Sequence, residues 1–278
     1  MSTSLAMPQI FSVQGRVALI VGGSGVLGGE LARGLARAGA RVAVAGRRIE
    51  ASQRVAEEIR AAGGQARGVA CDALERASLE RAADEIAANL GPVDILINAT
   101  GGNQPQATTG PERSFFDLEI QAIDAVMAGN YSGVVQTCQV FGRQMAERGE
   151  GCIINIASMS GLRPLTRVVA YSGAKAAVAN FTQWLAVHMA QEYNPRIRVN
   201  AIAPGFFLTE QNRFLLTDAG SGVWTARGQA IIAHTPMGRL GAPADLVGTA
   251  LWLASPASAF VTGVVVPVDG GFAAYSGV

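Results

Sequence analysis

A continuous run of aliphatic residues, Val17 to Val21, ends directly at a glycine-rich turn, and this feature most constrains the fold. The run has no polar alternation, which is typical of a strand buried on both faces, as in a parallel sheet covered by helices. A helical pattern follows the turn, with Leu31 and Leu35 on one face, and it ends near Gly39. The chain therefore begins as a strand, a tight turn and a helix.

The same alternation continues along the chain. Strands are expected over 41–45, 66–70, 93–98, 152–157, 198–202 and 263–267, and helices over 54–61, 79–90, 120–148 and 170–191. This order requires right-handed crossovers and predicts an α/β fold, a doubly wound parallel sheet with helices on both faces. No repeat, linker or shift in composition divides the sequence, so we expect one domain over residues 1–278.

The turn itself has the pattern G-x-G-x-x-G over residues 23–28, between the buried strand and the helix. Glycines at these positions permit the tight turn, let the backbone approach a pyrophosphate and allow close packing of helix on strand. The N-terminus of the helix adds free N–H groups and a positive dipole end. The pattern therefore predicts a dinucleotide site, although glycine-rich turns also occur as simple tight connections.

The end of the next strand indicates which dinucleotide binds. An NAD site normally has an acidic residue about 20 residues after the turn, to bind the ribose 2′-hydroxyl. Here Gly46 is followed by Arg47 and Arg48. Arginine suits a 2′-phosphate, so we expect NADP(H) to be favoured over NAD(H). The alternative is that both arginines are solvated loop charges.

A second motif combines a tyrosine with a lysine. Tyr171 and Lys175 are spaced i,i+4 at the start of an expected helix, which places phenol and ammonium on one face. A phenol with a pKa of about 10 is a poor acid–base catalyst at neutral pH, and a nearby cation is expected to lower that pKa. Ser158 follows the strand 152–157, where it can orient a substrate oxygen.

Composition excludes several other classes of function. The 22 basic and 21 acidic residues leave a net charge of +1, which gives no electrostatic footprint for a nucleic acid. Three scattered cysteines are too few for a disulfide framework or a metal cluster. Met1 to Gln14 lacks the features of a signal peptide, and no long apolar run predicts a membrane span. We expect a cytoplasmic protein that needs no metal and binds no nucleic acid or membrane.

Together these motifs resemble those of the short-chain dehydrogenase/reductase family over residues 13–275. The resemblance rests on their order along the chain: residues 21–28, Asp72, residues 98–101, Asn130, Ser158, Tyr171 with Lys175, and Pro204 with Gly205. It implies a Rossmann-type fold and hydride transfer between a nicotinamide and a carbonyl/alcohol pair. It also implies a homo-oligomer, a tetramer or a dimer.

The resemblance assigns roles residue by residue. Tyr171 is the general acid, Ser158 holds the carbonyl oxygen, Lys175 binds the nicotinamide ribose and tunes Tyr171, and Asn130 holds a water in the proton relay. The sequence departs from the family pattern at three places. Val21 and Val26 affect the detailed geometry of the phosphate loop, and Ala99 with Thr100 affects the packing behind the adenosine pocket. The expected cofactor contacts are Gly22, Ser24, Gly25, Leu27, Gly28, Arg47, Arg48, Asp72, Ala73, Asn98, Gly101, Tyr171, Lys175, Pro204, Gly205, Phe207 and Thr209.

Two segments are expected to set the substrate: the amide-rich loop 101–106 and the segment 209–235, which we expect to form a lid. Amides with one or two arginines suit a polyhydroxylated anion. Residues 101–103, 203–213, 234–239 and 266–272 also resemble the fructuronate reductase (D-mannonate oxidoreductase) branch of the family. Besides Ser158, we expect Asn103 and Arg213 to contact the substrate. The alternative for Arg213 and Arg163 is that they pair with carboxylates at subunit contacts, and a lone histidine such as His234 is more often a surface or core residue than a catalyst.

Two other functions remain open at this point. A 3-oxoacyl-thioester or general ketone reductase would use the same catalytic residues, although the balanced charge gives no basic patch for a carrier protein. A regulator that senses NADP(H) without turnover is the alternative from another class. The complete set Asn130, Ser158, Tyr171 and Lys175 argues against it, because binding alone does not need a proton relay.

Overall fold

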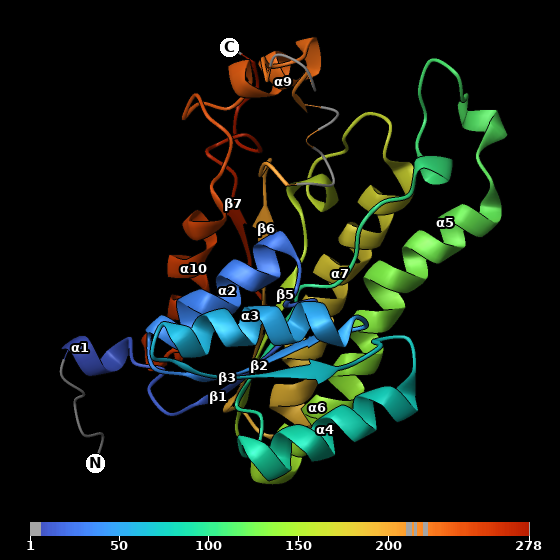
Figure 1. Cartoon of the computed structure of the whole chain (residues 1–278). Helices are drawn as coiled ribbons and strands as arrows, with labels where there is room; N and C mark the ends of the chain where they lie inside the picture. The colour runs from blue at the N-terminus through green and yellow to red at the C-terminus, as the bar shows by residue number, and fades with distance from the viewer. Residues whose placement is uncertain (1–6, 210–212, 214–215, 219–221, 278) are drawn as a thin grey trace.

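The computed structural model describes residues 7–209, 213, 216–218 and 222–277. Within them the strands form one seven-stranded parallel sheet in the order β3-β2-β1-β4-β5-β6-β7 (Figure 1). The doubly wound Rossmann-type sheet predicted from the sequence is confirmed. The strands are β1 (Val17–Val21), β2 (Arg41–Gly46), β3 (Gln65–Ala70), β4 (Ile95–Asn98), β5 (Gly151–Ile156), β6 (Ile197–Pro204) and β7 (Val265–Val268).

Helices cover both faces of the sheet, and the alternation of side chains along β1 divides the core in two. Val17, Leu19 and Val21 pack under α4 (Arg76–Asn89), α6 (Gly133–Arg148) and α7 (Val169–His188). Ala18 and Ile20 pack under α2 (Val26–Arg37), α3 (Ile49–Ala61) and α10 (Val247–Ala254). Burying one such aliphatic side chain contributes about 1.5–3 kcal/mol, so this strand anchors both layers.

The chain order creates a crevice beside β1. The crossovers run from β1 to β2 and β3 on one side, and β4 then lies on the other side of β1. Loops leaving β1 and β4 must therefore pass each other at the carboxyl ends of the strands, which is where ligands bind in open α/β sheets. Gly22 has a φ of +84°, and a Cβ built on it would lie 2.6 Å from the carbonyl oxygen of Ala99. Only glycine permits this crossing.

The structure differs from the sequence prediction in its helices. The helix expected over 120–148 is α5 (Ile120–Met127) and α6 joined by a π-helical turn, Ala128–Ser132, and the helix expected over 170–191 ends in a second one, Met189–Tyr193. The sequence analysis did not predict α9 (Ala226–Ala233) or α10, both of eight residues, or α1 (Met7–Ile10). None of the described helices is long and apolar enough to cross a membrane.

Candidate active site

The turn after β1 forms a cradle of backbone atoms. A Cβ on Gly23 would lie 2.9 Å from the carbonyl oxygen of Ile20, and one on Gly28 would collide with the carbonyl of Gly22. Gly25 is the N-cap of α2 and offers no side chain to its N–H groups. An uncapped helix N-terminus behind a glycine turn suits a phosphate group. Leu27 packs against the core layer of α2, and Ser24 lies beside Gly46.

The end of β2 carries charge without a counter-ion. Arg47 and Arg48 are exposed, and neither lies within 4 Å of a carboxylate in the described part of the chain. A Cβ on Gly46 would lie 3.2 Å from both the Ser24 and the Ser52 hydroxyl oxygens. The Ser52 hydroxyl is fully buried and has no hydrogen-bond partner. This corner can therefore donate and accept hydrogen bonds and attracts anions.

Asp72 and Ala73 follow β3. The Asp72 carboxylate accepts a hydrogen bond of 2.9 Å from the Leu74 N–H, and the Asp72 N–H donates to the Ser78 hydroxyl at 3.0 Å. These bonds hold the turn, and the half-buried carboxylate stays at the crevice edge. Ala73 is buried under Gly133 of α6, so it supports the turn by packing.

Asn98 ends β4 with its side chain turned into the core. Its amide nitrogen donates to the Asn155 side-chain oxygen at 2.9 Å, and Asn155 in turn donates to the Thr182 hydroxyl at 2.9 Å. Asn98 is fully buried and its side-chain oxygen has no partner. This network ties β4 and β5 to α7. The cofactor contact expected at Asn98 stays a prediction.

Ser158 and Tyr171 form a hydroxyl pair. The Ser158 oxygen accepts hydrogen bonds from the Ser160 N–H at 3.2 Å and the Ser160 hydroxyl at 3.0 Å. The Ser158 hydroxyl also faces the Tyr171 phenol closely enough to influence its pKa. Burial raises the pKa of Tyr171 above its ordinary value, and the bond from Ser158 acts in the opposite direction. Sequence analysis expected Lys175 to lower this pKa; without ligand, burial dominates instead.

Lys175 lies behind this pair. Its ammonium donates to the Ile156 carbonyl at 2.8 Å and approaches the Thr100 carbonyl at 3.5 Å, and it is 5.7 Å from the centre of the Tyr171 ring. Only 3% of the residue is exposed, and burial lowers the pKa of Lys175 to about 8. Two strand-end carbonyls thus hold a cation that is easily deprotonated beside the phenol.

Asn130 lies in the π-helical turn, a feature frequent at functional sites. Its amide donates to the Gly102 and Val126 carbonyls at 2.7 and 2.8 Å and accepts from the Gly102 N–H at 3.1 Å. Gly101 has a φ of +119°, and a Cβ there would collide with the Asn130 side chain and lie 3.3 Å from the Lys175 ammonium. The structure therefore brings Asn130, Gly101 and Lys175 together, whereas the water-holding role of Asn130 stays a prediction.

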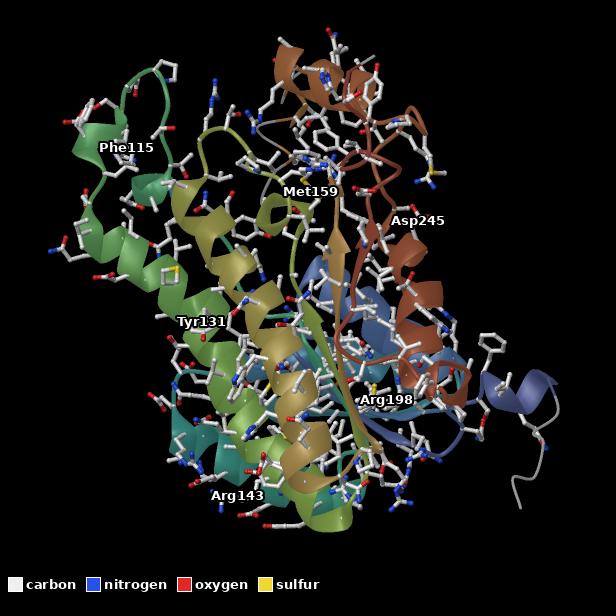
Figure 2. All side chains as sticks on the ribbon, turned by 180° about the vertical axis from the view of Figure 1, so that it is seen from behind. Phe115, Tyr131, Arg143, Met159, Arg198 and Asp245 are labelled. Carbon is white, nitrogen blue, oxygen red and sulfur yellow. The ribbon has the colours of Figure 1, made fainter. Side chains whose placement is uncertain are left out.

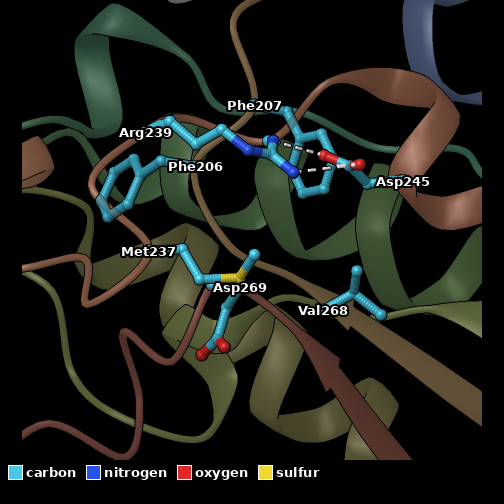
Figure 3. A pocket seen from close by; sticks show the side chains of 9 residues that line it. Phe206, Phe207, Met237, Arg239, Asp245, Val268 and Asp269 are labelled. Carbon is cyan, nitrogen blue, oxygen red and sulfur yellow. Dashed lines mark hydrogen bonds and ion pairs between the residues drawn. The ribbon is translucent and has the colours of Figure 1, made fainter.

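The segment after β6 forms the opposite wall. A Cβ on Gly205 would lie 2.6 Å from the Asp269 Cβ, so the backbones run in close contact. Phe207 is buried and covers Gly241. Figure 3 shows a pocket of about 150 Å³ at this segment, where the Arg239 guanidinium pairs with Asp245 at 2.6 Å. Its lining does not include Asn130, Ser158, Tyr171 or Lys175. Phe207, one of the expected cofactor contacts, lines this pocket.

The expected substrate residues lie on the surface. Asn103 is exposed and its amide donates to the Thr108 hydroxyl at 2.8 Å. Arg213 is also exposed, and its carbonyl accepts from the Thr217 N–H at 2.7 Å. His234 is near the rings of Phe272 and Tyr275, which is a packing role. Residues 210–212, 214–215 and 219–221 of the expected lid lie outside the described residues.

Sequence reasoning missed Ser160 and the carbonyls of Thr100 and Ile156. Ser160 had a signal, since a serine two residues from another can bond to it locally. Four buried side-chain atoms in the described residues have no partner, and they belong to residues that flank the crevice or Tyr171: Ser52, Asn98, Thr100 and Ser172. With the glycine cradle, these atoms fit a polar dinucleotide. Among described residues, no group of three or more His, Cys, Asp or Glu could hold a metal.

Comparisons with known proteins agree with this geometry. The family model for short chain dehydrogenases matches residues 16–219. The uncharacterized oxidoreductase UxuB of Bacillus subtilis is 50% identical over 276 residues, which cover 96% of this chain and 98% of that protein.

Two solved structures are also similar over almost the whole chain. A candidate D-mannonate oxidoreductase from Haemophilus influenza with bound NAD has a TM-score of 0.90 and 42% identity, covering 98% of this chain and 100% of that one. A gluconate 5-dehydrogenase from Burkholderia cenocepacia, in complex with NADP and tartrate, has a TM-score of 0.86 and 34% identity, covering 97% and 100%. The expected resemblance to the mannonate oxidoreductase branch is confirmed. The chain therefore belongs to the short-chain dehydrogenase family and is an oxidoreductase that acts on CH–OH groups.

Proposed function

We propose that this enzyme interconverts a keto and a hydroxy sugar acid of the D-fructuronate/D-mannonate type, with NADP(H) preferred over NAD(H). The observation that carries the proposal is the hydroxyl pair of Ser158 and Tyr171 backed by the buried ammonium of Lys175. The pair presents two donors to one substrate oxygen, which is the arrangement that polarises a carbonyl.

The protein's own groups supply the acid and the orientation. In reduction, the Tyr171 hydroxyl gives its proton to the carbonyl oxygen, and the Ser158 hydroxyl donates a hydrogen bond to the same oxygen. The Lys175 cation stabilises the resulting phenolate through the field of its charge. Asn130 orders the loop at Gly102 and would hold the water that reprotonates the site. A bound nicotinamide supplies the hydride.

The sugar-acid part rests on the amide-rich loop and on the relatives. Asn103 and Gln104 belong to a surface loop at the carboxyl end of β4, where hydroxyl groups of a substrate can be bound. One similar structure is described as a candidate D-mannonate oxidoreductase, and another is a gluconate 5-dehydrogenase that holds tartrate. All three named compounds are hydroxy acids. In this proposal residues 209–235 form the lid, with Arg213 contacting the substrate.

The cofactor preference rests on the corner at Gly46. Arg47 and Arg48 are exposed and have no described counter-ion, and no carboxylate occupies position 46. The similar structures include one with NAD and one with NADP, so the family resemblance favours neither. A 2′-phosphate gains charged hydrogen bonds from the two arginines that a 2′-hydroxyl does not.

We also propose a cytoplasmic homo-oligomer, a dimer or tetramer, built from one domain over residues 1–278. Light scattering of the purified protein tests this assembly. A single mass equal to one 278-residue chain at all concentrations would contradict it.

The function is tested by following NADPH and NADH oxidation with D-fructuronate and, separately, with an acetoacetyl thioester. We expect fructuronate turnover, faster with NADPH. Tyr171→Phe should abolish turnover and keep cofactor affinity. The double variant Arg47→Gln/Arg48→Gln should raise KM for NADPH about tenfold or more, with Arg54→Gln on α3 as the matched control.

Each contrary result has a defined meaning. Turnover of the thioester alone would replace the sugar acid by an acyl substrate and keep the catalytic assignment. Binding of NADPH without turnover of any carbonyl would favour the regulator. A preference for NADH would show that the two arginines are solvated loop charges.

A further inference from the structure

Two arginines outside the expected site lie at the same end of the molecule. Arg167 is in the loop that joins Ser158 to α7, two residues before the helix begins, and Arg227 is in the first turn of α9. Figure 1 shows α9 and the loop before α7 at the same end of the structure. Partial burial lowers the pKa of Arg227, and the nearby charge of Arg167 lowers it further.

Each arginine occupies an unfavourable position. Arg167 has a φ of +75° and is the single non-glycine residue with positive φ in the described part of the chain. Such a conformation is rare for residues other than glycine, asparagine and aspartate, and it persists where the surrounding structure imposes it. Arg227 is half-buried at the positive end of a helix whose first turn has no acidic residue, and that is where cations are disfavoured.

Nothing in the described residues offsets these positions. Neither guanidinium lies within 4 Å of a carboxylate among residues 7–209, 213, 216–218 and 222–277. Two like charges near each other, one on a strained backbone and one partly desolvated, are stabilised when an anion binds between them. An outlier of this kind points from structure to a ligand.

Local contacts fix Arg167 beside the catalytic centre. Its carbonyl accepts a hydrogen bond of 3.0 Å from the Thr109 N–H, which ties the loop to the segment after β4. Ala107 of that segment and Ala170 of α7 belong to one apolar cluster against which Tyr171 packs. These contacts hold the Arg167 backbone in the loop that leads into α7, four residues before Tyr171.

We infer that Arg167 and Arg227 together bind the carboxylate of the substrate and select acids over uncharged polyols. The inference rests on the proposed function and names residues different from the expected contact Arg213. A guanidinium forms bidentate charged hydrogen bonds with a carboxylate, and two guanidinium groups from different segments can bind the same carboxylate.

Binding of D-mannonate and of D-mannitol, which has CH₂OH in place of the carboxylate, is measured by calorimetry with saturating NADP⁺. A Tyr171→Phe background prevents turnover. We expect Arg167→Gln and Arg227→Gln each to weaken D-mannonate about 10- to 100-fold and to leave D-mannitol unchanged. Arg143→Gln on α6, an exposed arginine at the other end of the molecule (Figure 2), is the matched control and should change neither.

A second measurement is independent of the sugar. Tartrate should raise the Tm of the holoenzyme, and each variant should reduce that rise. Arg167→Gly relieves the positive φ, so it should raise the Tm without ligand and still lose the response to tartrate. If the arginine variants reduce the rise in Tm caused by tartrate but no hexonate binds, the proposed substrate is wrong and the carboxylate site stands. If the variants change neither acid, or weaken acid and polyol equally, the inference is wrong.

Discussion

Replacing Lys175 by methionine removes a buried charge at a defined place. Lys175 is the single lysine in the sequence, and the other Lys or Arg positions are all arginine. In the ligand-free protein it is 3% exposed, is held by the Ile156 carbonyl at 2.8 Å and has no carboxylate partner among the described residues. Methionine keeps the length of the side chain and removes the titratable group.

The magnitude follows from the pKa, which burial lowers from 10.5 to about 8. At about 1.4 kcal/mol per pKa unit, this difference corresponds to about 3 kcal/mol of unfavourable free energy when the folded protein carries the charge. Below pH 8 the lysine is protonated in both states, and the full cost is present. Between pH 8 and 10.5 the unfolded chain binds more protons than the folded one, so stability rises with pH. Above 10.5 both states are neutral.

Denaturant unfolding of both proteins without cofactor, from pH 6.5 to 11, measures the effect. The free energy of unfolding of the wild type minus that of Lys175→Met should be constant below about pH 7, rise by about 3 kcal/mol through pH 8–10.5 and then level. Titrating groups distant from Lys175 are the same in both proteins and cancel in the difference. NMR of protein labelled with ¹³C-lysine should show one side-chain titration near pH 8. A midpoint above 10, or a difference independent of pH, would refute the reasoning.

Three further outcomes are expected. Gly22→Ala should lower the free energy of unfolding by about 2 kcal/mol or more, because its Cβ would lie 2.6 Å from the Ala99 carbonyl oxygen at a φ of +84°. It should also abolish cofactor binding in a fluorescence titration, and a normal affinity would contradict the argument that only glycine permits the crossing. Asn155→Leu should destabilise by about 1–3 kcal/mol in urea, because the Asn98 amide loses its oxygen acceptor, whereas an unchanged midpoint would show that the network is dispensable. Burial raises the pKa of two thiols to about 12 and also raises that of the third, so a disulfide reagent at pH 8 should react with the cysteines only after denaturation: Cys71, Cys138 and Cys152.

The parts of the site that the sequence predicts are those encoded over a few residues. The strand 17–21, the turn after it and the i,i+4 pair of Tyr171 and Lys175 each depend on local spacing, and the structure has β1, the glycine cradle and α7 at these places. The doubly wound parallel arrangement of the strands followed from the right-handedness of the crossover connections. Local pattern and topology agree here because each element is buried by its neighbours in the sheet.

What the sequence did not predict depends on tertiary contacts. The π-helical turn at Asn130 exists because the Asn130 amide bonds to Gly102, which is 28 residues away. Helices α9 and α10 are short, and α10 is apolar because it packs on the sheet rather than because of a helical period. The left-handed conformation of Arg167 has no sequence signal, since glycine or asparagine would be expected there.

The alternation of side chains along β4 predicts the orientation of Asn98. Leu96 packs into the core layer of α6 and α7, whereas Ile95 and Ile97 pack into the layer of α2 and α10. Side chains alternate along a strand, so Asn98 must face the same way as Leu96, into the core. Its partner Asn155 follows Ile153 with the same parity on β5. The period of two thus predicts a buried amide pair, and the resemblance alone does not.

The buried polar groups at the crevice are of two kinds, those with hydrogen-bond partners within the protein and those without. The amide of Asn155 has partners within the protein, and its bonds to Asn98 and Thr182 join β4 and β5 to α7 whether or not a ligand is present. The hydroxyls of Thr100 and Ser52 are buried without a partner, and the ammonium of Lys175 is charged against the cost of burial. Unsatisfied buried groups are unfavourable, and the two apolar layers supply the stability of the fold. The unsatisfied groups gathered at the carboxyl ends of the strands are therefore those that a ligand must satisfy. Binding should therefore add stability through Thr100, Ser52 and Lys175, whereas the Asn155 network contributes equally in both states.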